Sequence, residues 1–312
     1  MKQCLGLNVL MMLLLAFASN AQADSGRKSD EERIMAATAK AMKGDSSLSA
    51  AKLNELIKNK EPGYMIISLQ SPEEYRNGHI PGAVHLPIDL ADLPGALKQL
   101  PKDKTIAVVS ANGQEACKIT LVLRQLGYEA KNVMLGMNAY NRLYAGAGAY
   151  LGDIDGKIST EAGTLPPASP QPTYSDGLSD EALILRNTEA YAKLFRPFNI
   201  TAYDLLAARD DAVLISMQMP ADYAKGHIPG TINIPGPDFL AGDQRLLQLP
   251  KDKKIIVTCY IGHYSSLGTM MLNQMGYEAY SLTWGLSGWN IEALGDEIKT
   301  AITKGFGFET VK

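Results

Sequence analysis

The chain has 312 residues and a formal net charge of −3 at pH 7, and its basic residues form no cluster. Such a charge pattern gives no electrostatic attraction for nucleic acid or anionic lipid, so neither is expected as a partner. A chain of this length suits two domains, each large enough to bury a core of its own.

Residues 1–23 have the three parts of a secretory signal peptide. Lys2 precedes the apolar stretch LGLNVLMMLLLAFA, and small residues follow at Ala21 and Ala23. We expect cleavage after Ala23, because charge, apolar core and small residues in that order define a cleavage site. A membrane anchor is the competing interpretation, but neither this run nor any later one reaches the ~20 apolar residues that cross a bilayer. The mature chain is expected to be periplasmic or secreted, without stable membrane insertion.

The rest of the chain is a unit of about 150 residues that occurs twice. The repeated blocks, in the same order, are GHIPG at 78–82 and 226–230, LPKDK at 100–104 and 249–253, and (L/M)GYEA at 126–130 and 275–279. Two copies at one fixed spacing indicate paired domains. We expect the first domain at 24–152, a linker rich in Gly, Pro and Ser at 153–178, and the second domain at 179–312.

Each copy opens with a helix whose first turn is acidic, and short apolar strands then alternate with helices. The opening helices are DEERIMAATAKAMKG at 30–44 and DEALILRNTEAYAKLF at 180–195. The expected strands are 65–69, 105–109 and 133–135 in the first copy and 213–217, 254–258 and 279–282 in the second. This alternation predicts the α/β class, with a small parallel sheet and helices on both of its faces in each domain. Ligands bind beyond the carboxyl ends of such strands.

Cys259 follows the strand at 254–258, and the sequence CYIGHYSS leads from it into the next helix. The N–H groups of such a turn and the positive end of the helix dipole favour the thiolate of Cys259 and also hold an anion. Gly262 allows the loop to curl around the sulfur. We therefore predict that Cys259 is a nucleophile beside an anion site. The alternative is an inert cysteine that fills space between strand and helix.

Several motifs together resemble the rhodanese family over nearly all of both copies. They are PEEYRNGHIPGAVHLP and PADYAKGHIPGTINIP after an apolar strand, the Cys-x-x-Gly-x-x-Ser loop, and WGLSGW at 284–289. The resemblance implies tandem rhodanese-like domains of which only the second is active. A loop cysteine would take sulfane sulfur from thiosulfate or a persulfide-type donor and pass it to a thiophilic acceptor, such as cyanide, a thiol or a protein.

Under this resemblance the catalytic residue is Cys259. The loop that binds the small sulfur-containing anion would comprise Tyr260, Ile261, Gly262, His263, Tyr264 and Ser265. No metal or organic cofactor is implied, and Cys259 with His263 alone would make a poor metal site. Phosphatases of the same fold place an arginine after a longer loop, and no arginine follows Cys259.

The loop departs from the family pattern in its charge. Tyr260 and Tyr264 stand where family loops usually carry basic residues, so His263 is the loop side chain that can become cationic. Because a histidine has an ordinary pKa of about 6.5, we expect activity with thiosulfate to be low and to rise as the pH falls toward that value. The missing cations also favour an alternative function, a non-catalytic periplasmic carrier or binding protein for sulfane sulfur, selenium or a similar soft anion.

The first copy carries a degenerate loop, SANGQEA. Ser110 stands at the position of Cys259, and no base that could ionise it is evident. Gly113 keeps the loop glycine, and Glu115, at the position of Tyr264, would place a negative charge beside the anion site. The first copy is therefore predicted to be inactive and to serve structure or contact, with a serine nucleophile as the less favoured alternative.

The remaining distinctive residues are given structural roles. Cys117 is predicted to be buried and inert, and no disulfide is indicated because it and Cys259 lie in separate copies. The other assignments are hydrogen bonds to the GHIPG turns for His79 and His227, a neutral hydrogen-bonded replacement of the usual family ion pair for Ser68, Gln70, Ser216 and Gln218, and core and pocket-wall positions for Trp284 and Trp289.

Overall fold

The computed structural model describes residues 27–167, 170–194 and 196–312. The predicted signal peptide, 1–23, lies outside these residues and stays a prediction. Each described helix is too short or too polar to cross a membrane.

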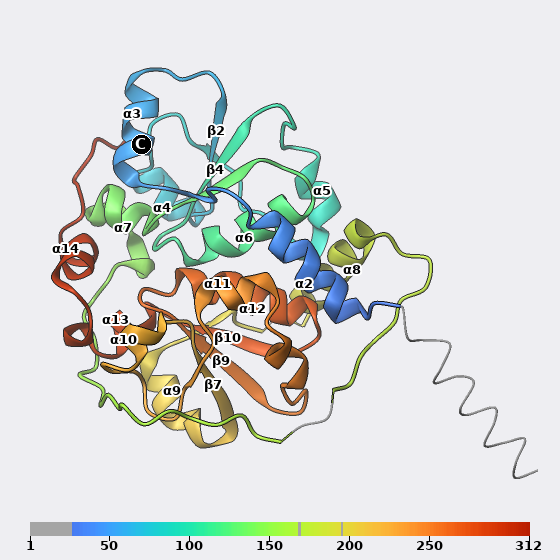
Figure 1. The fold of residues 1–312 in the computed structure, drawn as a ribbon. Coiled ribbons are helices and arrows are strands. Elements are labelled where there is room, and N and C mark those ends of the chain that lie inside the picture. The colour runs from blue at the N-terminus through green and yellow to red at the C-terminus, as the bar shows by residue number, and fades with distance from the viewer. Residues whose placement is uncertain (1–26, 168–169, 195) are drawn as a thin grey trace, which may run out of the picture.

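The first module, in the upper half of Figure 1, contains one parallel sheet with helices on both faces. Its helices and strands, in chain order, are α2 (Asp30–Ala41), β1 (Ser47–Leu48), α3 (Ala50–Lys58), β2 (Tyr64–Ser68), α4 (Pro72–Asn77), β3 (Val84–His85), η1 (Leu90–Asp92), α5 (Leu93–Leu97), β4 (Thr105–Val109), α6 (Gln114–Gln125), β5 (Ala130–Val133), α7 (Gly136–Tyr140), η2 (Arg142–Tyr144) and η3 (Gly146–Gly148).

The second module repeats this order in the lower half of the molecule. Its helices and strands are α8 (Asp180–Ala192), β6 (Asn199–Ile200), α9 (Ala202–Ala208), η4 (Arg209–Asp211), β7 (Ala212–Ser216), α10 (Pro220–Tyr223), β8 (Ile232–Asn233), α11 (Gly236–Ala241), η5 (Gln244–Gln248), β9 (Lys254–Thr258), α12 (His263–Gln274), β10 (Glu278–Leu282), α13 (Gly285–Trp289), η6 (Ile291–Ala293) and α14 (Asp296–Lys304).

The two sheets have the same topology, which confirms the predicted α/β class. Their strand orders are β1-β5-β4-β2-β3 and β6-β10-β9-β7-β8, and all pairs are parallel. The central strands β4 and β9 are apolar and buried over nearly their whole length, as strands covered on both faces must be. The carboxyl ends of β4 and β9 therefore point Ser110 and Cys259 toward equivalent places in the two modules.

The modules meet through their helices and share one core. α6 packs against α12, and the opening helix α2 lies against both α6 and the second-module helices α11 and α12. α8 likewise contacts η1 and α5 of the first module. A single cluster of buried apolar side chains runs across this contact, with Ile34 and Leu123 on one side and Phe239 and Met271 on the other. The opening helix of each copy thus helps to cover the other copy.

The segments after each module also cross over. Residues 153–163, within the predicted linker, run along the second module, where Ser159 forms an antiparallel bridge with His227 and the Gly163 N–H donates to the Thr231 carbonyl. The C-terminal tail returns to the first module, where Val311 forms the matching bridge with His79 (Figure 1). Each module is therefore completed by a strap from the other.

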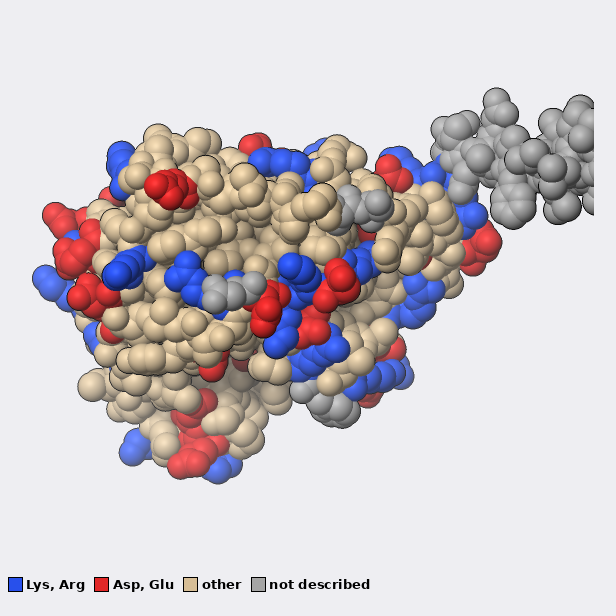
Figure 2. Space-filling view, turned by 90° about the horizontal axis from the view of Figure 1, so that it is seen from below, with Lys and Arg blue, Asp and Glu red and all other residues tan. Residues whose placement is uncertain are grey.

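The surface carries charges of both signs side by side. On the face shown in Figure 2, Lys and Arg side chains lie interspersed with Asp and Glu, and no large region has one sign. Single ion pairs also join the two modules. In one of them the Lys251 ammonium lies 2.7 Å from the Glu31 carboxylate.

Candidate active site

The loop at the end of β9 is held by the WGLSGW segment. The Cys259 carbonyl accepts a hydrogen bond from the Leu286 N–H at 2.7 Å, and the Tyr260 carbonyl accepts one from the Ser287 N–H at 3.0 Å. Gly285 has φ +55°, and a Cβ there would lie 2.4 Å from the Cys259 carbonyl oxygen. A glycine is therefore required for the loop and α13 to approach this closely.

Gly262 turns the chain from the loop into α12. It has φ +86° and is the residue that precedes the first turn of the helix, as predicted. Cys259 is 2 % exposed, and its Sγ accepts a hydrogen bond from the Ser265 hydroxyl at 3.6 Å. Ser265 is fixed in turn by Ser281, whose hydroxyl lies 2.8 Å away. The sulfur is thus placed against the first turn of a helix, with a hydroxyl directed at it.

The degenerate loop shows where its backbone N–H groups point. The Ser110 hydroxyl oxygen accepts hydrogen bonds from the N–H groups of Gly113 at 3.1 Å and Ala116 at 3.2 Å. Gly113 has φ +85°, the same turn as Gly262. A loop of this shape therefore directs its N–H groups at the side chain in the position of Cys259, the arrangement that holds anions.

A cavity of about 450 Å³ opens beside Cys259, and both modules line it. Its lining residues are Gly44, Asp45, Ser46, Ser47, Cys117, Asn132 and Met134 from the first module, and Cys259, Tyr260, Ile261, His263, Tyr264, Leu267 and Ile298 from the second. Cys117 is buried, as predicted, and both cysteines are free. The prediction that they form no disulfide is confirmed, and both line the cavity at the module boundary.

The two loop tyrosines have different environments. The Tyr260 hydroxyl donates to Asp222 at 2.7 Å and accepts from the Met219 N–H at 3.0 Å, and burial raises the pKa of Tyr260 to about 12. Tyr260 is therefore neutral and tied to α10. Tyr264 is 49 % exposed, and its ring packs against Gly236, where a Cβ would come within 2.8 Å of the ring. Tyr264 forms one rim of the cavity.

His263 is not the loop cation that the sequence suggests. It is 6 % exposed, and its Nε2 lies 3.0 Å from the Asn112 carbonyl oxygen of the first module. Burial lowers the pKa of the His263 imidazole, and the hydrogen bond to Asn112 opposes this only in part. The prediction that His263 begins to charge near its ordinary pKa is therefore corrected: the ring is neutral at pH 7 and donates Nε2–H to Asn112.

Gln114 of the first module holds the Cys259 loop from the opposite side. Its side-chain nitrogen lies 3.3–3.4 Å from the Gly262 carbonyl and the Ser281 hydroxyl, and its oxygen accepts from the Trp284 N–H at 2.9 Å. Gln114 is the equivalent of His263 in the repeat, and His263 in turn contacts Asn112 in the loop of the first module. Gln114 is not among the site residues predicted from the sequence, although its place in the repeat was the signal that could have identified it.

The cavity has no cationic wall. Among the described residues that line it, none is Lys or Arg, and Asp45 is the carboxylate at its edge. Asp45 pairs with Lys131 at 2.9 Å, and that hydrogen bond holds the pKa of the Asp45 carboxyl below its usual range. The described part of the site therefore offers an anion the Ser265 hydroxyl, without a Lys or Arg side chain, and the likeness of its turn to the Ser110 loop favours backbone N–H donors as well.

The first-module loop has other neighbours. Ser110 is buried, and no described carboxylate or imidazole hydrogen-bonds to it, while Glu115 lies exposed on the first turn of α6. Lys118 is buried and donates to Asn199 at 2.6 Å, and burial lowers its pKa to about 7. Here α6 serves as a contact with the second module.

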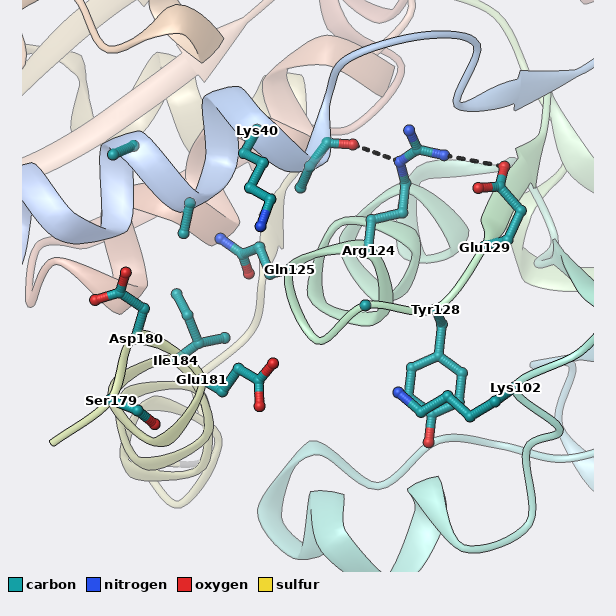
Figure 3. A pocket seen from close by; sticks show the side chains of 14 residues that line it. Lys40, Lys102, Arg124, Gln125, Tyr128, Glu129, Ser179, Asp180, Glu181 and Ile184 are labelled. Atoms are coloured by element: carbon teal, nitrogen blue, oxygen red, sulfur yellow. Dashed lines mark hydrogen bonds and ion pairs between the residues drawn. The ribbon is translucent and has the colours of Figure 1, made fainter.

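A larger cavity lies away from both cysteines. It is an open groove of about 730 Å³ between α2, α8 and the end of α6, shown in Figure 3. Two of its basic side chains are engaged: Arg124 donates to the Ala41 carbonyl at 2.5 Å and pairs with Glu129, and Lys102 lies 3.4 Å from the centre of the Tyr128 ring. The described residues that line the groove include no cysteine, so the cavity beside Cys259 is the candidate site.

The residues that were predicted to have structural roles have them, with two corrections. Ser68 donates to Gln70 at 2.9 Å, and Ser216 to Gln218 at 2.8 Å, which confirms the neutral replacements. The histidines bond to the preceding helix and not to the Pro-Gly turn itself: His79 Nδ1 lies 2.8 Å from the Tyr75 carbonyl, and His227 Nδ1 lies 2.7 Å from the Tyr223 carbonyl. The core positions of Trp284 and Trp289 are confirmed, but neither lines the Cys259 cavity.

A family model for the rhodanese-like domain matches residues 49–143 and 201–292, once in each module. The chain belongs to the rhodanese-like family. It contains two rhodanese-like domains, and each match includes the loop that follows the central strand of its sheet.

Several named proteins are similar to one rhodanese-like domain of this chain. The putative sulfurtransferase YtwF of Bacillus subtilis is 33% identical over 93 residues, which are 30% of this chain and 87% of the relative. The thiosulfate sulfurtransferase GlpE of Stutzerimonas stutzeri is 37% identical over 82 residues, which are 25% of this chain and 70% of the relative. A solved thiosulfate sulfurtransferase from Pseudomonas aeruginosa aligns over 91% of this chain and 49% of its own, at 16% identity and a TM-score of 0.30.

Proposed function

We propose that the second rhodanese-like domain is a sulfurtransferase that carries sulfane sulfur as a persulfide on Cys259. The observation that carries this proposal is the position of Cys259. Its Sγ lies at the mouth of a strand-to-helix turn, receives the Ser265 hydroxyl and faces a cavity. The relatives named sulfurtransferases support the same reaction class.

The proposed reaction has two transfers. The Cys259 thiolate attacks the outer sulfur of thiosulfate, a sulfur–sulfur bond forms to Sγ, and sulfite leaves with the electron pair of the broken bond. An acceptor such as cyanide then attacks the outer sulfur of the persulfide, which yields thiocyanate and returns the thiolate. The N–H groups around the loop would stabilise the negative charge of donor and persulfide in both steps.

Mass spectrometry after incubation with a sulfane donor tests this proposal. We expect the peptide with Cys259 to gain one sulfur atom and to lose it when cyanide is added, with thiocyanate as product. Cys117 is the internal control and stays unmodified, because burial raises the pKa of its thiol well above the usual range. Cys259→Ser should abolish both adduct and turnover, whereas Ser110→Ala should retain them. Turnover that survives Cys259→Ser would refute the assignment.

A second candidate function is supported by the absence of Lys and Arg among the described residues of the cavity. Without side-chain cations, repeated turnover of a dianion is weakly assisted, and the chain would serve as a carrier that binds sulfane sulfur, selenium or another soft anion and hands it to a partner. A carrier forms the adduct on Cys259 once and shows no multiple turnovers with cyanide. A sulfurtransferase shows both.

We also propose that the chain acts beyond the inner membrane after cleavage at Ala23, on the basis of the charge, apolar core and small residues of 1–23. Cell fractionation with N-terminal sequencing tests this. A mature protein that begins at residue 24 supports export, and an uncleaved cytoplasmic chain opposes it.

A further inference from the structure

The fold leaves one polar group beside Cys259 unused. Asn132, in β5 of the first module, is 1 % exposed, and its side-chain oxygen accepts a hydrogen bond of 3.2 Å from the Ser47 hydroxyl. Its amide nitrogen is buried and finds no acceptor among the described residues. An unpaired buried donor destabilises a fold. Of the described residues that carry such a group, Asn132 is the one that lines the Cys259 cavity.

The repeat shows that the fold is able to satisfy this position. Ser281 is the equivalent of Asn132 in the second module, and its hydroxyl is engaged by Ser265, Ser266 and Gln114. In both modules a serine and an asparagine face each other on neighbouring strands, but in opposite order. In the first module Ser47 pairs with Asn132, and in the second Asn199 pairs with Ser281. In the second module the position is closed by protein partners, whereas in the first module Asn132 lines the cavity.

The rest of the cavity wall favours an organic ligand. Its described side chains include the apolar groups of Met134, Ile261, Leu267 and Ile298, and the exposed carboxylate of Asp45 lies at its edge. A small dianion would meet no Lys or Arg among the described lining residues and would gain nothing from the apolar walls. A ligand with an apolar body buries surface there and needs a polar group to fix its orientation.

We propose that Asn132 is a substrate-binding residue of the Cys259 site, and that the site takes an organic sulfane-sulfur donor with an acceptor oxygen. The inference rests on the proposed sulfurtransferase function. The amide nitrogen of Asn132 donates to the oxygen of the donor, the body of the donor packs on the apolar walls, and its sulfane sulfur meets Cys259. The first module is therefore part of the substrate site, although its own loop lacks a cysteine.

Benzenethiosulfonate is a probe of this class. The Cys259 thiolate attacks its terminal sulfur, the new sulfur–sulfur bond forms as the bond to the sulfonyl sulfur breaks, and benzenesulfinate leaves with the electron pair. The numbers of atoms and charges are equal on both sides. The sulfonyl oxygens are the acceptors that Asn132 would bind.

The test compares two asparagines with the same defect. Asn273 in α12 is also buried with an unpaired amide nitrogen, and its oxygen accepts from the Ala279 N–H at 2.9 Å, but it does not line the cavity. Asn132→Asp and Asn273→Asp each keep the side-chain oxygen that accepts a hydrogen bond and remove the amide nitrogen that has no partner. We expect Asn132→Asp to raise the KM for benzenethiosulfonate about tenfold with little change in kcat, and Asn273→Asp to leave KM within about twofold of wild type.

Asn132→Leu separates the lost hydrogen bond from the added charge of Asn132→Asp. It should raise the same KM by a similar factor with only a small change in melting temperature, because loss of the 3.2 Å hydrogen bond from the half-buried Ser47 hydroxyl is offset by removal of a buried donor that has no partner. Wild type should also show a KM for thiosulfate at least about tenfold above that for benzenethiosulfonate.

The outcomes separate this inference from the proposed function. If persulfide forms on Cys259 but Asn132→Asp and Asn132→Leu keep the wild-type KM, Asn132 is not a substrate-binding residue and the sulfurtransferase assignment stands. A lower KM for thiosulfate than for benzenethiosulfonate overturns the substrate class in the same way. If neither donor produces persulfide on Cys259 of wild type, the proposed function fails and this inference fails with it.

Discussion

His263 shows how a contact between modules changes the chemistry of a residue. From the loop sequence alone, His263 is the side chain that can become cationic beside the sulfur. In the structure its Nε2 donates to Asn112, and its ring fills the space where a Cβ of Gly113 would lie, 2.6 Å from Nε2. The protonated form would lose solvation there, so the imidazole is held neutral.

A pH experiment follows from this position. Activity with either sulfane donor should not rise as the pH falls from about 8 to about 6.5, because His263 stays neutral over that range. Since burial holds the folded-state pKa of His263 below its unfolded value, the unfolded chain takes up the proton first. Its contribution to stability is therefore complete above about pH 6.5 and is lost as the pH falls through the folded-state pKa.

His263→Gln, which copies Gln114, removes this titration. Thermal melting at about pH 7.5 and about pH 5 should show a smaller acid-induced fall in melting temperature for His263→Gln than for wild type. Equal falls, or thiosulfate activity that rises toward pH 6.5 in wild type alone, would restore the loop cation that the sequence suggested.

At the scale of elements, the N-terminal ends of α6 and α12 interlock. The Gln114 side chain packs on Gly262, and the His263 side chain packs on Gly113. The first residue of each helix therefore contacts the glycine that precedes the other helix. Both glycines also have positive φ. The sequence predicts the conformation of Gly262 from its place in the turn, but not this contact, because a residue that faces another domain leaves no periodic signal.

Gly262→Ala tests the interlock. A Cβ at this position would lie 2.4 Å from the Gln114 side-chain nitrogen, in addition to the strain of φ +86°. We expect a loss of about 2–4 kcal/mol in the free energy of unfolding, measured by urea denaturation, and a loss of turnover. Gly276→Ala is the matched control, since Gly276 has φ +85° and open space around it, and it should lose only about 1 kcal/mol. Equal losses would mean that Gln114 moves aside freely.

Other elements show where pattern reading succeeds. The predicted ranges of β2, β4, β7, β9 and β10 agree with the structure to within one residue, because apolar cores such as 255–257 become buried strands. The predicted strand at 133–135 is shifted, because Lys131 and Asn132 interrupt the apolar run while Leu135 already turns with φ +57°. The two-residue edge strands were missed, since so few residues carry no alternation.

The site could be predicted in part for the same reason. Cys259, Gly262 and Ser265 lie in one loop, and the local pattern of strand, turn and helix places them together. Asn132, which lines the cavity, and Gln114, which bonds to the Cys259 loop, come from the other copy, more than a hundred residues away in the chain. They reach the site through the contact between the modules, in which α6 packs against α12. An alignment of the two copies indicates which positions correspond, but it does not show that the copies face each other.

At the scale of the molecule, the two modules are expected to fold as one unit. They share a continuous apolar core. The tail of the chain packs on the first module, where the centre of the Phe308 ring lies 5.3 Å from that of Tyr140 and the Phe308 N–H donates to the Tyr140 carbonyl. Cooperative unfolding of both modules in one transition is expected, because neither has a complete set of neighbours alone.

Phe308→Ala tests this coupling. Loss of its half-buried ring should lower the free energy of unfolding by about 1–2 kcal/mol and shift a single melting transition to lower temperature, as followed by calorimetry. Phe306→Ala is the control, since that ring is 58 % exposed and should cost less than about 0.5 kcal/mol. Two separate transitions in the Phe308 variant would show that the modules unfold independently.

The crossing of the two straps also affects the order in which the modules are completed during synthesis. The first module is made first, yet its bridge at His79 and its contact at Tyr140 come from Val311 and Phe308, which follow the whole second module in the chain. Until those residues are made, the backbone of His79 and the ring of Tyr140 lack these partners. Completion of the first module is therefore expected only after the second module has been synthesised, and an unfinished chain would present a surface that chaperones and proteases are able to engage.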